Sequence, residues 1–67
     1  MSKFIKLTSV YGKNERPVYI RKDAIISLER SSDYIDYDKY DFTAVGKTYS
    51  RERVKETPEE ILKMLED

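Results

Sequence analysis

The sequence predicts an α+β domain, in which a strongly bent antiparallel sheet of four or five strands carries one C-terminal helix packed across it. Three observations lead to this prediction. Most of the chain before residue 57 consists of short apolar runs that alternate with polar residues, the spacing of half-buried strands. The last eleven residues carry a helix-start signal followed by an apolar stripe. With 67 residues, the chain is long enough for a single domain over 1–67.

Two strands are expected in the N-terminal third. Residues 3–10 alternate apolar and polar side chains, and residues 17–21 do so again. The segment between them contains Gly12, which tolerates the positive φ of a tight turn. Pro17 has no N–H to donate, so it belongs at the start of a strand or on a sheet edge. The two runs therefore predict a hairpin.

Three further strands are expected over residues 25–30, 40–45 and 48–55. The β-branched isoleucines of the first favour strand over helix, and Asp23 before it either caps a helical turn or closes a turn. The other two are separated by a predicted turn at Gly46. In 48–55 both faces of the run are largely polar, which predicts an edge strand or a strand whose middle projects from the domain.

The clearest local signal predicts a helix over about 58–66. Thr57 is placed as the N-cap, Pro58 occupies the first helical position, and Glu60 follows the cap by three residues, the spacing of a capping box. An apolar stripe follows, which docks either on the sheet of the same chain or on a partner: Ile61, Leu62, Met64 and Leu65. The expected core contains these residues: Ile5, Leu7, Val18, Ile20, Ile26, Leu28, Val45, Ile61, Met64 and Leu65.

The composition argues against several classes of function. The chain has no cysteine and no histidine, so disulfides, thiolate metal sites and the commonest general base are excluded. Its only glycines, Gly12 and Gly46, make no phosphate-cradling loop. We therefore expect no enzyme and no cofactor. No apolar run approaches the ~20 residues that span a bilayer, which predicts a cytoplasmic protein without membrane insertion.

Residues 31–42, SSDYIDYDKYDF, combine four aspartates with three tyrosines. The aspartates lack the spacing and the turn glycine of a calcium loop, so no metal site is predicted at Asp33, Asp36, Asp38 or Asp41. The segment is interpreted instead as the end of one strand, a solvated turn and the start of the next. The tyrosines either cover the edge of the core or form an interaction surface: Tyr34, Tyr37 and Tyr40.

A basic stripe is expected on one face of the 48–55 strand. It consists of Tyr49, Arg51, Arg53 and Lys55. Such a face suits phosphates and stacked bases, but the formal net charge of the chain is zero, which makes nucleic acid the less favoured partner. Pairing of the stripe with the aspartates is simpler, within one chain or between two. The second case predicts a weak, salt-sensitive homodimer.

The order of features resembles the small flagellar-operon FlbD/SwrD family. The resemblance rests on IKLT followed by Gly12, on YI before Asp23, on LE at residues 28–29, and on VKETPEEI leading into an apolar helix. The sequence departs from the family pattern at Arg21, in the longer 31–42 segment and in the extended spacing from Gly46 onward. The resemblance implies a small bacterial cytoplasmic protein that supports motility without being an enzyme.

The sequence thus predicts a small non-enzymatic interaction or adaptor domain that binds an unidentified protein partner in the cytoplasm. Two alternatives stay open. One is a nucleic-acid-binding regulator that uses the face of Tyr49, Arg51, Arg53 and Lys55. The other is an uncharacterised protein of a phage or mobile element.

Overall fold

Five strands form one antiparallel sheet in the order β2-β1-β5-β4-β3 in the computed structural model, which describes residues 3–66. The elements are β1 (Phe4–Tyr11), β2 (Asn14–Arg21), a 3-10 turn η1 (Lys22–Ala24), β3 (Ile25–Ile35), β4 (Asp38–Lys47), β5 (Arg51–Val54) and the helix α1 (Pro58–Glu66). The α+β architecture predicted from the sequence is confirmed. Within residues 3–66, no helix has the length and apolar character needed to cross a membrane.

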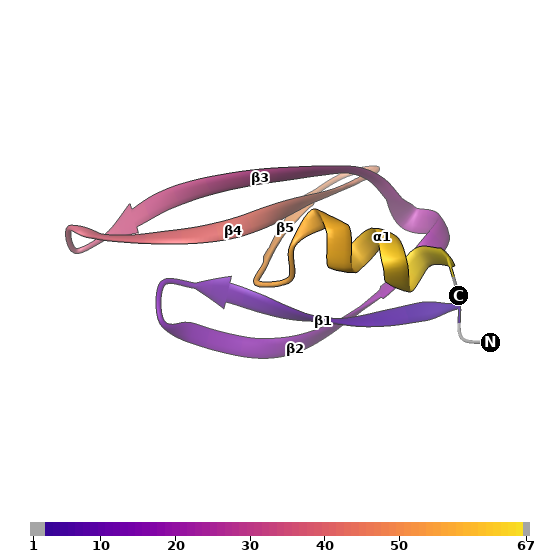
Figure 1. The fold of residues 1–67 in the computed structure, drawn as a ribbon, viewed down its shortest axis with the longest axis horizontal. Helices are drawn as coiled ribbons and strands as arrows, with labels where there is room; N and C mark the ends of the chain where they lie inside the picture. Colours follow the sequence, from indigo (N-terminus) through magenta and orange to yellow (C-terminus); the bar gives the residue numbers. More distant parts are fainter. Residues whose placement is uncertain (1–2, 67) are drawn as a thin grey trace.

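Two hairpins and one bridging strand make up the sheet. In Figure 1 the β1–β2 hairpin lies below the longer β3–β4 hairpin, and α1 lies between them in one half of the molecule. The short strand β5 joins the hairpins, since Val54 pairs with Ser9 of β1 on one side and with Thr43 of β4 on the other. Beyond α1, the turn of each hairpin extends toward the same end of the molecule (Figure 1).

The main core lies where α1 meets the bent sheet. Ile61 is the buried residue of α1, and it joins an apolar cluster from four strands: Ile5, Leu7, Ile20, Val45 and Val54. Four other predicted core residues are partly buried and pack against this cluster: Val18, Leu28, Met64 and Leu65. The apolar stripe of α1 therefore docks on the sheet of its own chain, although Leu62 stays exposed.

One predicted core residue was wrong. Ile26 is 66% exposed, because the pairing of β3 with β4 shifts register between Ile25 and Ser27 and leaves Ile26 without an opposite residue. Three buried apolar residues were missed: Val10, Phe42 and Val54.

The predicted strand over residues 48–55 also needs correction. β5 covers only Arg51–Val54, and it lies in the middle of the sheet instead of at an edge. The preceding turn involves Lys47 and Ser50, where the Lys47 N–H donates to the Ser50 carbonyl at 2.8 Å. Gly46 lies inside β4 and makes no turn, and a Cβ there would collide with Ser27 Oγ.

The capping box is confirmed. The Glu60 N–H donates to Thr57 Oγ1 at 3.2 Å, and the Thr57 N–H donates to Glu60 Oε1 at 3.0 Å. The bonds that the Glu60 carboxylate accepts from the Thr57 N–H and, at 3.1 Å, from the Thr57 hydroxyl hold the pKa of this carboxyl below its usual range. The segment before the helix is anchored to β1, because Glu56 accepts bonds from the Thr8 N–H at 2.9 Å and from the Thr8 hydroxyl at 3.0 Å.

Candidate interaction surface at the hairpin tips

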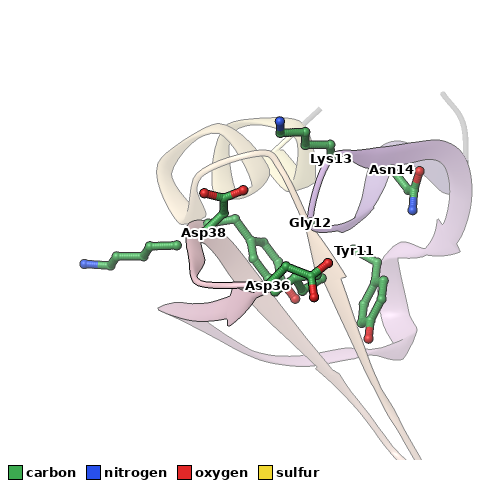
Figure 2. A pocket seen from close by; sticks show the side chains of 9 residues that line it. Tyr11, Gly12, Lys13, Asn14, Asp36 and Asp38 are labelled. Carbon is green, nitrogen blue, oxygen red and sulfur yellow. The ribbon is translucent and has the colours of Figure 1, made fainter.

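The turns of the two hairpins face each other across an open cleft of about 360 Å³. Figure 2 shows Gly12 and Lys13 of the β1–β2 turn with Asn14 at the start of β2 on one side, and Asp36 of the β3–β4 turn with Asp38 at the start of β4 on the other. The full lining is Tyr11, Gly12, Lys13, Asn14, Ile35, Asp36, Asp38, Lys39 and Tyr40. Residues far apart in the sequence thus share one concave surface, which we call the tip cleft.

The β3–β4 turn has an unusual backbone. Ile35 pairs with Asp38 across a two-residue loop, in which both Asp36 (φ 51°) and Tyr37 (φ 70°) adopt the left-handed conformation. Positive φ at both loop residues matches a type I′ turn, whose twist suits a hairpin. Aspartate tolerates this conformation, whereas for a bulky residue such as tyrosine it is an outlier. The turn therefore holds Tyr37, 100% exposed, in a strained backbone at the end of the molecule.

Gly12 allows the two tips to approach. Its φ is 64°, and a Cβ built there would lie 2.8 Å from Ile35 Cδ1. Any larger side chain would therefore press on the β3–β4 hairpin and would also strain the turn. Gly12 and Ile35 both line the tip cleft.

A network of charged and aromatic side chains stiffens the longer hairpin behind the cleft. Arg53 Nη1 donates to Asp33 Oδ2 at 2.8 Å and to the Tyr40 hydroxyl at 2.7 Å. Its guanidinium carbon lies 4.5 Å from the centre of the Phe42 ring, a cation–π distance, and Tyr40 packs on Phe42 with ring centres 5.6 Å apart. The Arg53 hydrogen bond, with one from the Tyr34 N–H, holds the pKa of Asp33 below its usual range.

The structure divides the residues that the sequence marked for interaction. Tyr34 (65% exposed) and Tyr37 lie in the β3–β4 hairpin near its tip, whereas the part-buried Tyr40 lines the cleft and bonds Arg53. Tyr49 is 98% exposed in the turn between β4 and β5, which lies at the opposite end of the molecule (Figure 1).

Two of the side chains in the basic stripe are paired with acidic residues of the same chain. Arg53 is held by Asp33, and Lys55 Nζ lies 3.6 Å from Glu15 Oε2, so both side chains face acidic partners. Arg51 is exposed on β5, and Tyr49 lies in the turn before the strand. Pairing of the stripe with the aspartate segment thus occurs within one chain at Arg53.

Sequence reasoning missed Tyr11, which is 64% exposed and lines the tip cleft. Its position directly before Gly12 indicated that it lies at the end of a hairpin. The neighbouring sequence gave no sign that this end lies beside residues 35–40. The missing information is the long-range approach of the two hairpins.

The four aspartates of residues 31–42 do not converge. Asp33 bonds Arg53, while Asp36 and Asp38 line the cleft together with Lys13 and Lys39. Among the residues that the structure describes, no group of three or more acidic side chains is arranged to hold a metal ion. The prediction that the chain binds no metal stays a prediction, to be tested by titration.

Comparison with protein-family models, curated proteins and solved structures finds no match for this chain. The resemblance to the FlbD/SwrD family therefore stays an expectation from the motifs quoted above.

Proposed function

We propose that this chain is a small non-enzymatic protein-interaction domain, acting as an adaptor in the cytoplasm, which binds its partner through the hairpin tips. The observation that carries the proposal is Tyr37, a fully exposed aromatic side chain held on a strained turn beside a cleft. Tyrosine is over-represented at the energetic centres of protein interfaces. A bulky residue in a left-handed turn is a stability cost, and such costs cluster at functional positions.

The surroundings of Tyr37 support the same assignment. Tyr11 lines the same cleft. The cleft lining also carries charges of both signs, negative on Asp36 and Asp38 and positive on Lys13 and Lys39. The mixture suits a polar rim around an aromatic contact, the usual arrangement of a protein interface. By resemblance, the partner would belong to the motility apparatus.

The nucleic-acid alternative receives less support from the geometry. A phosphate-binding face needs cations that are free to meet the backbone, yet Arg53 and Lys55 face acidic side chains of the same chain. Binding to random single-stranded and duplex nucleic acid at two salt concentrations tests this alternative directly. Affinity that falls steeply with salt would support it.

The interaction proposal is tested by photo-crosslinking in cells. A photoreactive phenylalanine analogue at Tyr37 is compared with the same analogue at Tyr19, which is 64% exposed on β2 away from the cleft lining. We expect a discrete crosslinked protein from position 37 and none from position 19. Equal products from both positions, or none from position 37, would contradict the proposal.

The captured partner is then purified, and its affinity is measured against variants. Tyr37→Ala is expected to weaken binding by about tenfold or more, the effect of losing a hot-spot aromatic. Tyr19→Ala, the matched control, is expected to leave the affinity unchanged. Loss of binding in both variants would point to a different surface.

A further inference from the structure

The two edges of the sheet differ in their capacity to accept another strand. Within residues 3–66, β2 and β3 are the edge strands. Asn14 pairs with Tyr11 across a two-residue turn, so alternate residues of β2 direct their backbone outward, and Pro17 is one of them. Because Pro17 has no N–H, the β2 edge lacks a donor at its middle. This edge is protected against pairing.

The part of the β3 edge that extends past α1 contains no proline. The hydrogen-bonded pair Ile35–Asp38 sets the phase of the ladder, so odd residues of β3 face β4 and even residues face outward. The outward residues of this half are Arg30, Ser32 and Tyr34. Tyr34 shows the consequence: its N–H, which does not reach β4, donates to the Asp33 side chain at 2.7 Å. Residues 29–35 contain no proline or glycine and form a long edge, on which the Tyr34 N–H has to leave Asp33 before it can bond an added strand.

We propose that residues 29–35 of β3 pair antiparallel with the same residues of a second copy of this chain, with Ser32 on the two-fold axis. The pairing would join the two sheets into one continuous sheet. A domain of 67 residues without disulfides has a small core, so its stability is marginal and a second copy would support it.

Charge and size select the register. In a two-fold antiparallel pair each residue meets the one placed symmetrically about the axis. An axis at Glu29, Arg30 or Asp33 would set that residue against its own copy, and an axis at Ser31 would oppose Glu29 to Asp33. Like charges directly opposite each other destabilise a sheet.

The axis at Ser32 avoids every such clash. It opposes the small Ser32 to itself, Ser31 to Asp33, and Arg30 to Tyr34, where a guanidinium can lie over an aromatic ring. Arg30 Nη1 donates to Thr43 Oγ1 of β4 at 3.2 Å in the single chain, so the guanidinium has to give up this bond to lie over Tyr34 of the second copy. This dimer does not use the Arg53–Asp33 pair, which is closed within each chain.

The first experiment is sedimentation equilibrium from micromolar to millimolar concentrations. The wild-type chain is expected to dimerise, and Ser32→Pro is expected to raise the dissociation constant by about tenfold or more, because it removes an outward donor and leaves the β3–β4 ladder intact. Ser32→Ala is the matched control and keeps the N–H. A wild-type chain that stays monomeric overturns the proposal and leaves the edge to an extended segment of another protein. A dimer that a folded Ser32→Pro variant retains overturns it as well.

The second experiment does not depend on the proline variant. The chain has no cysteine, so Ser32→Cys introduces a single thiol. Opposite Cα atoms of a hydrogen-bonded antiparallel pair lie about 5.5 Å apart, within the range of a disulfide. Mild oxidation is expected to crosslink Ser32→Cys faster than Ser50→Cys, an exposed control in the β4–β5 turn. Equal crosslinking rates for the two variants would overturn the Ser32 register.

Discussion

Arg53 of the central strand β5 and Asp33 of the edge strand β3 form an ion pair of 2.8 Å that reaches across β4. The two residues lie twenty positions apart in the sequence. Arg53 also bonds Tyr40 and lies over Phe42, so one guanidinium holds the longer hairpin to the rest of the sheet. The hairpin that carries Tyr37 is thereby fixed relative to the core.

This ion pair predicts a stability loss in acid. The pKa of Asp33 lies below the ordinary 3.8 in the folded chain, so folding favours its ionised form. The pair therefore contributes stability above about pH 4, and that contribution disappears as the pH falls through the lowered pKa. Denaturant melts at a series of acidic pH values measure this part of the free energy of unfolding.

Variants isolate the contribution of the pair. Asp33→Asn is expected to flatten the acid limb of the profile more than Arg53→Met, which leaves the Tyr34 N–H bond to Asp33, and the double variant is expected to match Asp33→Asn. An acid limb that stays unchanged in both single variants would contradict this prediction.

The helix cap predicts a measurable stability cost. Thr57→Ala removes the hydroxyl that accepts the Glu60 N–H, and it is expected to lower the free energy of unfolding by about 0.5–2 kcal/mol. Thr48→Ala, which removes an exposed hydroxyl in the β4–β5 turn, serves as control. Thermal melts that coincide for Thr57→Ala and the wild type would show that the cap does not hold α1.

Tyr37 predicts opposite effects on stability and binding. Tyr37→Gly relieves a left-handed conformation that costs a non-glycine residue about 1–2 kcal/mol. Glycine is more flexible in the unfolded chain, and this greater loss of entropy on folding costs about 0.5–1 kcal/mol. The net expectation is a gain in stability of about 0.5 kcal/mol with weaker partner binding. Tyr37→Ala removes the ring but keeps the strain, so it is expected to weaken binding without the gain in stability. A Tyr37→Gly variant with lower stability would refute the strain argument.

The aspartate segment predicts no response to divalent cations. Calcium or magnesium at millimolar concentration is expected to leave the NMR shifts of the four aspartates unmoved, because their side chains are not gathered into one site: Asp33, Asp36, Asp38 and Asp41. Saturable shifts confined to these residues would reveal a metal site and reverse the interpretation of the segment.

Several features followed from the sequence because their causes are local. The capping box needs only the spacing of Thr57 and Glu60, and the helix begins where that spacing places it. The alternation around Gly12 predicted the first hairpin, and Pro17 lies on an edge strand as its missing N–H required. The strand–turn–strand interpretation of residues 31–42 is likewise confirmed.

The position of β5 depended on contacts that no local pattern contains. Its polar residues suggested an edge, yet the strand lies between β1 and β4, where Val54 is buried and Arg53 finds partners across the sheet. A polar side chain is tolerated in a central strand when a distant residue satisfies it, and the sequence does not show which residue that is.

The sequence by itself determined the helix, its cap, the hairpins and most of the main core, because each depends on residues a few positions apart. The tertiary structure alone decided which strands are central, that Ile26 turns outward at a bulge, and that Phe42 is buried. It also decided that Tyr11 shares a cleft with Tyr40. The physical reason is that a bent sheet brings together residues far apart in the chain, and their burial depends on that approach and not on the spacing of their neighbours.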